Sequence, residues 1–357
     1  TVLASATQRY DYTSPQPGWG EIDPELWWQA LVAALAELRP QVDLYQAQVV
    51  AVTGQMHTAV LLDAERRPLR PVILWLDRRA SAETEELQGA LKLPPYHLNS
   101  TYTLPKLLWL ARHVPQVAAQ ARYLLWPKDY LRFRLTGQIF TDRTEAGGAA
   151  LLDWETETWA EERLERVGFS PEILPPLRRF TDDAGPLRTD VAQQLGLSPQ
   201  ARVIIGAGDV LALVTAAPPA AGRVTCSLGT SSMVFTPLAE GQWVEDPQRR
   251  LYSYPLLPYP LLGGVSSTTG ASLQWLWRAV FAEAVPFEQM LATVQPIPAG
   301  ADGMFFLPYL SGERSPYWDD GLRGAFYGFT MTHSRAHMVR AVMEGVAFSL
   351  RYLLQIY

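Results

Sequence analysis

The chain has 357 residues, of which 48% are hydrophobic and 18% are charged, and its formal net charge at pH 7 is −6. These values suit a folded protein with room for about two domains, and they exclude a disordered, collagen-like or coiled-coil chain. The negative charge argues against binding to a nucleic-acid backbone, and no apolar run reaches the roughly 18 residues that a membrane span needs.

The first half of the chain alternates predicted strands and helices. Residues 1–12 begin with a strand-like alternation, and an amphipathic helix is predicted over residues 24–39 with Asp23 as its N-cap. The remaining elements follow in chain order, with strands at 49–53, 59–63 and 72–75 and helices at 80–92, 104–113 and 127–135. This alternation is typical of an α/β fold.

A second α/β unit is predicted after a loop and a short helix that end near residue 195. It starts with a buried strand at 202–205, and further strands are expected at 223–228, 231–236 and 261–265. We therefore expect two domains, at 1–199 and 200–357.

Both ends of the chain have features of a fragment. There is no initiator Met, and a helix predicted over residues 337–357 carries its apolar stripe to the end without a Gly cap or a polar tail. We therefore expect a chain truncated at both ends, without appreciable activity of its own.

Asp209 stands at the end of the strand at 202–205, after a turn with two glycines, Gly206 and Gly208. Ligands of α/β sheets gather at the carboxyl ends of strands, so this carboxylate is a candidate for contact with a substrate or a metal ion. A helix begins directly after it, and Asp is also a common N-cap. The pattern leaves both interpretations open.

Two segments of the second half combine glycine with hydroxyl side chains. Gly229 and Thr230 lie between two predicted strands, and Gly270 opens a predicted helix. Such segments can bring backbone N–H groups close to a phosphate. A plain hairpin and close packing of a helix on a sheet explain them equally well.

Two segments of the first half carry candidate sugar-binding groups. Met56 and His57 lie in a loop between strands, and Trp75 and Asp77 end the next strand. An indole ring can form one wall of a sugar site, and a carboxylate can accept hydrogen bonds from sugar hydroxyls. A single His or Trp is more often structural, so core packing is the competing interpretation.

Taken together and in order, these segments resemble the FGGY family of carbohydrate kinases. The matching segments run through the whole chain: PGWGEIDPELWW at 17–28, GQMHTAVLLD at 54–63, ILWLDRR at 73–79, TYTLPKLLWL at 101–110, LLWPKDYLRFRLTG at 124–137, GAGD at 206–209, SLGTSS at 227–232, GASLQWL at 270–276, LPYLSGERSPYWDDGLRGAFYGF at 307–329 and AVMEGVAFSL at 341–350. The resemblance implies two actin-like (ribonuclease H-like) ATPase domains with the site in the cleft between them.

The resemblance also implies an activity and roles for particular residues. It implies transfer of phosphate from ATP to a sugar hydroxyl, with Asp209 as the base that removes the hydroxyl proton and as a ligand of Mg²⁺. Met56, His57 and Trp75 then correspond to sugar-contacting positions, and Asp77 stays a sugar-binding candidate from its place at the end of the strand. The positions that correspond to ATP contacts are Gly229, Thr230, Gly270 and Gln274.

The loop at 55–58 and the segment at 127–130 look most like the xylulokinase branch, which implies a ketopentose such as D-xylulose. Thr58 and Val210 depart from that branch, which usually has Gly and Asn there. Val210 lacks the hydrogen bond that an Asn side chain would give to the sugar. Gluconate or another polyol or ketose therefore stays open, as does a non-catalytic sugar- or nucleotide-binding protein.

The resemblance places two further nucleotide-binding segments outside this chain. The family's Asp-x-Gly-Thr phosphate loop is expected before Thr1, and its Gly- and Ala-rich adenosine segment after Tyr357. The expected partners are a small-molecule sugar and ATP, without nucleic acid or membrane, and a homodimer is allowed. The single cysteine, Cys226, and the absence of a signal-peptide pattern favour a cytoplasmic protein.

Overall fold

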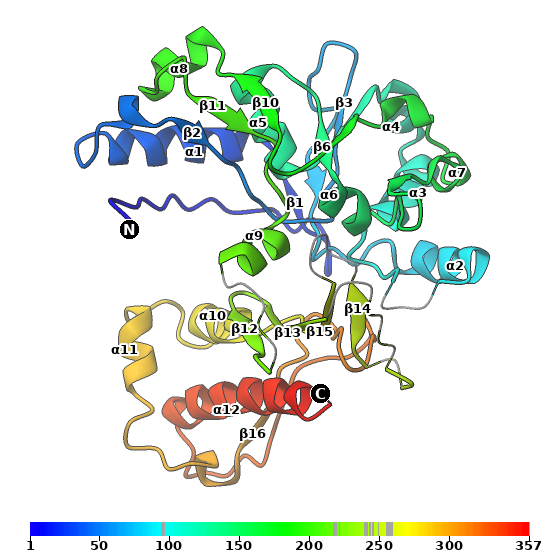
Figure 1. The fold of residues 1–357 in the computed structure, drawn as a ribbon. Coiled ribbons are helices and arrows are strands. Elements are labelled where there is room, and N and C mark those ends of the chain that lie inside the picture. The colour runs from blue at the N-terminus through cyan, green and yellow to red at the C-terminus, as the bar shows by residue number, and fades with distance from the viewer. Residues whose placement is uncertain are drawn as a thin grey trace. The chain divides into compact units, whose positions relative to one another are not determined.

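The computed structural model divides the chain into two compact units, Thr1–Ala216 and Ala217–Tyr357 (Figure 1). It describes residues 1–93, 97–216, 220, 222–238, 242, 244, 246–248, 250–254 and 260–356. Both units mix helices and strands, so the expected α/β class is confirmed. The division falls later than the boundary near residue 200 that the sequence predicts. The reason is that the strand and helix after residue 200 pack within the first unit.

The first unit contains short strands and helices in alternation. Its helices are α1 (Glu25–Leu38), α2 (Ser81–Leu91), α3 (Thr103–His113), α4 (Pro115–Gln120), α5 (Pro127–Thr136), α6 (Arg143–Gly148), α7 (Glu161–Arg166), α8 (Thr189–Leu195) and α9 (Asp209–Ala216). Its strands are β1 (Glu21–Ile22), β2 (Val49–Val50), β3 (Val60–Leu62), β4 (Val72–Ile73), β5 (Tyr123–Leu125), β6 (Thr141–Asp142), β7 (Leu152–Asp153), β8 (Thr158–Trp159), β9 (Leu177–Arg178), β10 (Asp183–Pro186) and β11 (Arg202–Ile204).

The sheet that positions the candidate site has the strand order β10-β11-β2. Strand β11 is parallel to β2 and antiparallel to β10. Helix α5 contacts β10 and β11, and α1 packs on both α5 and α8 (Figure 1). Buried apolar residues from these elements, among them Trp28, Leu135 and Val203, form one of the cores of this unit.

Most predicted elements of the first unit are present, with shifted bounds. Helix α1 starts at Glu25, and the amide of Glu25 donates to Asp23 Oδ1 at 2.9 Å, as expected for an N-terminal cap. The strand-like alternation of residues 1–12 is misleading, since the structure has no strand there. Val2 and Leu3 are 83% and 84% exposed, so no apolar face holds that segment against a sheet.

The second unit contains a four-stranded antiparallel sheet with the order β12-β13-β15-β14. Its elements are β12 (Thr225–Leu228), β13 (Ser232–Pro237), β14 (Tyr252–Tyr254), β15 (Leu261–Ser266), α10 (Gly270–Ala279), α11 (Phe287–Ala292), β16 (Phe305–Leu307), β17 (Ala325–Tyr327) and α12 (Arg335–Leu354). Helix α12 packs on α10, α11 and β16 and closes a core around Leu276, Phe306 and Val342.

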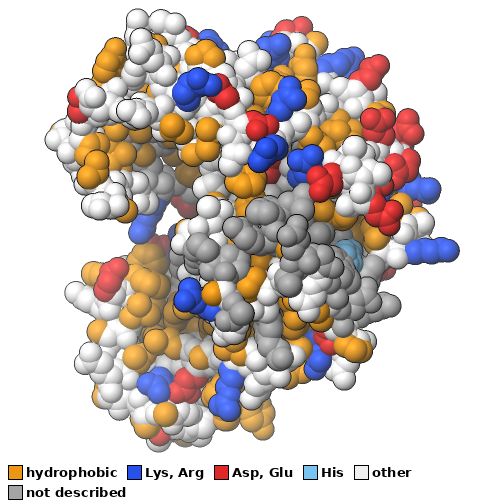
Figure 2. Space-filling model, in the orientation of Figure 1, with side chains coloured by type: hydrophobic (Ala, Val, Ile, Leu, Met, Phe, Trp, Pro, Cys, Tyr) orange, Lys and Arg blue, Asp and Glu red, His pale blue; other side chains and the backbone are white. Residues whose placement is uncertain are grey.

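The surface is mixed in character. On the face shown in Figure 2, acidic and basic side chains are interspersed, and hydrophobic side chains lie among them. Scattered apolar residues are ordinary on the surface of a folded protein. Among the residues that the structure describes, no helix is long and apolar enough to cross a membrane.

Candidate active site

Two chain segments lie side by side at the carboxyl ends of β2 and β11. Because these strands are parallel, the loops that follow them leave the same edge of the sheet. Gly54 and Gly208 form a parallel bridge, and the amide of Asp209 donates to the Gly54 carbonyl at 3.0 Å. Gly206 has φ +74°, and a Cβ there would lie 2.1 Å from the carbonyl oxygen of Val52. Only glycine permits this close approach.

Asp209 is the first residue of α9, and its side chain is exposed. The amide of Val210 donates to Asp209 Oδ1 at 2.9 Å. The structure therefore agrees with the interpretation of Asp209 as a residue that starts a helix. It also places the carboxylate at the strand end where a catalytic group was expected, so the two interpretations are compatible.

The turn before Asp209 is held by Thr144 of α6. The amide of Gly208 donates to Thr144 Oγ1 at 3.0 Å. The Thr144 hydroxyl and amide donate in turn to Asp142 Oδ2, at 2.6 and 2.9 Å. Two consecutive amides, those of Gly208 and Asp209, are thus fixed by partners from distant parts of the chain.

A buried ionic cluster lies behind this turn. Lys128 Nζ is 2.6 Å from Asp129 Oδ1 and 2.9 Å from Asp142 Oδ1, and Arg132 Nη1 is 3.0 Å from Asp129 Oδ1. These side chains are almost fully buried, and Arg132 Nη1 also donates to the carbonyl of Ile205 at 3.2 Å. The cluster therefore connects α5, β6 and the end of β11. Functional interpretation of the sequence did not assign it a role, although Arg132 follows Asp129 by three positions and Lys128 by four, which is the spacing of neighbours on a helix.

Met56 and His57 lie next to the Gly208 turn. A Cβ on Gly208 would be 2.6 Å from Met56 Cγ, so the side chain of Met56 packs against that backbone. The Nδ1 atom of His57 is 2.5 Å from the carbonyl oxygen of Gly148, and its ring lies 4.8 Å from that of Tyr102. The structure thus places these two predicted sugar-binding residues close to the turn that carries Asp209.

Trp75 is linked to the same loop. Its amide donates to Thr58 Oγ1 at 3.2 Å, and the Trp75 side chain is partly exposed. Thr58 itself is buried and fills the space beside this backbone. Trp75 therefore adjoins the loop of Met56 and His57, as a wall of the site would.

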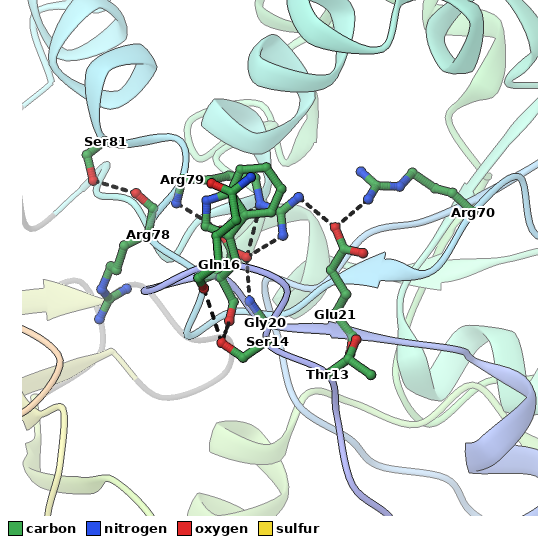
Figure 3. A network of polar contacts seen from close by, with 11 residues as sticks. Thr13, Ser14, Gln16, Gly20, Glu21, Arg70, Arg78, Arg79 and Ser81 are labelled. Atoms are coloured by element: carbon green, nitrogen blue, oxygen red, sulfur yellow. Dashed lines mark hydrogen bonds and ion pairs between the residues drawn. The ribbon is translucent and has the colours of Figure 1, made fainter.

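Asp77 has a different environment from its predicted one, since it belongs to the polar network of Gly20, Glu21 and Arg79. These three residues are labelled in Figure 3. Its carboxylate is fully buried and accepts hydrogen bonds from the Gly20 amide at 2.6 Å and from Arg79 Nη2 at 2.7 Å. The Arg79 guanidinium also lies 3.6 Å from the ring centre of Trp19 and 2.6 Å from Glu21 Oε1. In the structure Asp77 thus anchors its loop to the segment at 19–21, and its contact with a sugar stays a prediction.

The predicted phosphate-binding residues of the second unit come together. The amide of Gly270 donates to the Gly229 carbonyl at 2.9 Å, and the amide of Thr269 donates to the Thr230 carbonyl at 3.0 Å. Ser232 Oγ donates to Thr269 Oγ1 at 2.7 Å. The turn between β12 and β13 is thereby joined to the N-terminus of α10, as a phosphate-binding loop on a helix N-terminus would be.

Gln274 lies one turn after Gly270 on α10, and its side chain is exposed. Residues four positions apart share a helix face, so Gln274 and Gly270 point to the same side of α10.

Sequence reasoning did not single out Glu313. Its buried carboxylate accepts from Ser266 Oγ at 2.9 Å and from the Ser267 amide at 2.6 Å. Burial raises the pKa of Glu313, and the hydrogen bonds from Ser267, Arg314 and Ser266 oppose that rise.

The described residues contain no cluster of three or more His, Cys, Asp or Glu side chains that could hold a metal ion. Asp209 contributes a single exposed carboxylate. Mg²⁺ is usually bound by one or two carboxylates together with substrate phosphates and water. Among the residues that the structure describes, the donor set fits that kind of metal binding and does not fit a cage made only of protein ligands.

Comparisons with known proteins find matches to both units of the chain. Residues 1–215 match the N-terminal domain of the FGGY family of carbohydrate kinases, and residues 224–357 match its C-terminal domain. A xylulose kinase of Bacillus subtilis is 34% identical over all of this chain and 73% of its own length. A gluconokinase of the same species is 28% identical over 98% of this chain and 71% of its own length.

Solved structures of two other proteins superimpose on nearly the whole of this chain. A ligand-bound xylulose kinase of Lactobacillus acidophilus superimposes with a TM-score of 0.81 at 30% identity, over 98% of this chain and 72% of that one. A gluconate kinase of the same species superimposes with a TM-score of 0.80 at 29% identity, over the same shares of the two chains.

Proposed function

Because the chain belongs to the FGGY family of carbohydrate kinases, with its actin-like ATPase fold, we propose that it phosphorylates a ketopentose such as D-xylulose. ATP is the phosphate donor, as in the family, and the products are a sugar phosphate and ADP. The first unit binds the sugar, and the second unit binds the nucleotide.

The observation that carries this proposal is the position of Asp209. Its carboxylate stands at the end of β11, on a turn that Thr144 and Gly54 hold, and Met56 and His57 pack beside that turn. A base in phosphoryl transfer has to be fixed next to the hydroxyl that attacks phosphorus. A carboxylate at a strand end with a rigid backbone meets that need.

In the proposed reaction Asp209 accepts the proton of the sugar hydroxyl as its oxygen attacks the γ-phosphorus and ADP leaves. Met56, His57 and Trp75 orient the sugar, and Asp77 keeps the loop of Trp75 in place through Arg79. Mg²⁺, with Asp209 as a protein ligand, supplies neutralisation of phosphate charge when it is bound. Gly229, Thr230, Gly270 and Gln274 contact the phosphates and the nucleotide.

A second candidate substrate is gluconate. Val210 follows Asp209 directly, and its side chain has no group that can hydrogen-bond to a sugar. This departure from the xylulokinase pattern changes the surroundings of the base. Relatives named gluconokinase or gluconate kinase match the chain over nearly its whole length. The reaction type is the same for both substrates.

A coupled assay of ADP release tests the proposal on the complete gene product, with a panel of ketoses, polyols and aldonates. We expect turnover with a ketopentose and its loss in Asp209→Ala. Calorimetry on the same protein measures sugar binding separately. Sugar binding without phosphate transfer would instead indicate a non-catalytic binding protein, and full activity of Asp209→Ala would refute the role of Asp209.

A further inference from the structure

Glu145 of α6 is a buried carboxyl group that the proposed mechanism does not use. Its side chain is fully buried, and neither Oε1 nor Oε2 has a hydrogen-bond partner among the described residues. Buried carboxyl groups without a partner are rare in folded proteins, because burial removes their hydrogen bonds to water. Such a group calls for a ligand or a water molecule next to it.

The neighbours of Glu145 on α6 border the candidate sugar site. Thr144 precedes it and accepts from the Gly208 amide. Gly148 lies three residues later, and its carbonyl oxygen contacts His57. A Cβ on Gly148 would lie 2.7 Å from Met56 Cε. Residues three or four apart share a helix face, so the face of α6 that includes Glu145 adjoins the residues assigned to the sugar.

The charges around Glu145 support a contact with an uncharged group of a ligand, such as a hydroxyl. The buried cluster holds two other carboxylates, Asp129 and Asp142, which are paired with Lys128 and Arg132. Glu145 is therefore the carboxyl group beside this cluster whose two oxygen atoms have no hydrogen-bond partner among the described residues. Burial raises its pKa well above the usual range, and Lys128 opposes that rise while nearby carboxylates, including Asp209, add to it. A neutral carboxyl group can both donate and accept a hydrogen bond.

We propose that Glu145 binds the sugar through a hydrogen bond to a hydroxyl group next to the one that Asp209 deprotonates. This inference rests on the proposed function. Glu145 acts as a specificity-determining residue, since a buried polar group that is left without its hydrogen bond penalises any sugar that lacks that hydroxyl.

The test compares sugar binding by the wild-type chain, Glu145→Leu and Glu145→Gln in calorimetry. The probes are D-xylulose and D-gluconate, each with its set of monodeoxy analogues. We expect Glu145→Leu to weaken binding of the parent sugar about tenfold, which is the effect of one hydrogen bond to a buried group. For one deoxy analogue Glu145→Leu should not weaken binding relative to the wild type, because that analogue lacks the hydroxyl that Glu145 contacts.

The controls separate this role from a structural one. Glu83→Leu removes another buried glutamate of the same unit, on α2, and should leave sugar affinity unchanged. If Glu145→Leu does not fold, Glu145→Gln is compared with the wild type instead. The relative affinities of Glu145→Gln for the analogues should differ from those of the wild type at one hydroxyl position only.

Equal affinity of wild type and variants for every sugar would overturn the inference, as would an equal loss for every analogue. The first result fits a buried water and the second a structural role. If the wild-type chain binds none of the sugars, the proposed function fails and not the assignment of Glu145 alone.

Discussion

The hydroxyl group of Thr144 accepts a hydrogen bond from the amide of Gly208 at 3.0 Å, although the two residues lie 64 positions apart. The same hydroxyl donates to Asp142, which is paired with Lys128. The backbone just before Asp209 is therefore connected to a buried ionic cluster. This connection makes the position of the proposed base dependent on a threonine that is not expected to touch either substrate.

Replacing Thr144 by Val should affect both stability and catalysis. The substitution leaves the buried amide of Gly208 without its acceptor, which costs about 1–3 kcal/mol of unfolding free energy. Release of the turn also displaces Asp209, so we expect kcat to fall about tenfold or more. Urea unfolding and ADP release measure the two effects. Thr144→Ser keeps the hydroxyl and should retain both the stability and the kcat of the wild type. A Thr144→Val variant with normal kcat would contradict the positioning role.

Replacing Asp209 by Asn should reduce turnover without abolishing sugar binding. A general base contributes about 10²–10⁴-fold to a rate, and the amide cannot accept the proton. ADP release gives kcat, and calorimetry gives the sugar affinity, which should change only a few-fold. Asp190→Asn is a suitable control, since Asp190 forms an exposed pair with Arg188. A kcat of Asp209→Asn within tenfold of wild type would exclude Asp209 as the base.

Sequence patterns predicted the α/β class and most elements of the fold, because helices and buried strands have local periodicities. Helix α1 illustrates this, since its bounds differ from the predicted range by one residue at each end. Strand lengths were less predictable. The apolar run at 49–53 pairs only at Val49–Val50, because beyond them the carbonyl of Val52 faces Gly206 and the hydroxyl of Thr53 donates to the Ala207 carbonyl.

The proximity of the candidate site residues was predictable where motifs mark them, and not where a side chain is held by partners distant in the sequence. Met56, His57 and Asp209 stand in loops after strands, and the structure brings these loops together. Asp77 also follows a strand, but its carboxylate is held by Arg79 and by the Gly20 amide 57 residues away. Glu145 carries no local signal, because its unusual state comes from burial among groups of other elements.

Replacing Lys128 by Met should destabilise the first unit strongly. Lys128 pairs with both Asp129 and Asp142 inside the unit, so its removal leaves two buried carboxylates without that cation. Breaking a buried ionic network by removal of one partner typically costs about 3–5 kcal/mol. Urea unfolding measures the loss, with the exposed Lys92→Met as the control. A loss below about 1 kcal/mol would show that the cluster does not stabilise the fold in this way.

Replacing Gly270 by Ala should weaken nucleotide binding and leave sugar binding unchanged. The new Cβ would lie 2.6 Å from the Gly229 carbonyl oxygen, so the junction between the turn and α10 has to move. Such overpacking costs about 1–3 kcal/mol, and we expect an affinity for ATP about tenfold lower. Calorimetry with ATP and with the sugar separates the two effects. Gly89→Ala is the matched control, since a Cβ there meets no atom within 4 Å. Equal ATP affinity of Gly270→Ala and Gly89→Ala would argue against this phosphate-binding role.

Replacing Glu145 by Gln should change how stability depends on pH. The folded chain raises the pKa of Glu145 above its ordinary value of 4.5, chiefly through burial, so the folded state holds this proton more tightly than the unfolded state. The resulting stabilisation is complete below pH 4.5 and is lost as the pH rises toward the folded pKa. Gln cannot ionise, so the free energy of unfolding of Glu145→Gln should rise relative to wild type as the pH is raised from 4.5 toward the folded pKa. Urea unfolding across this range measures the difference, and Glu145→Leu should follow the same trend because it also lacks the charge. A difference that stays constant with pH in both variants would mean that Glu145 ionises as easily in the folded chain as in the unfolded one.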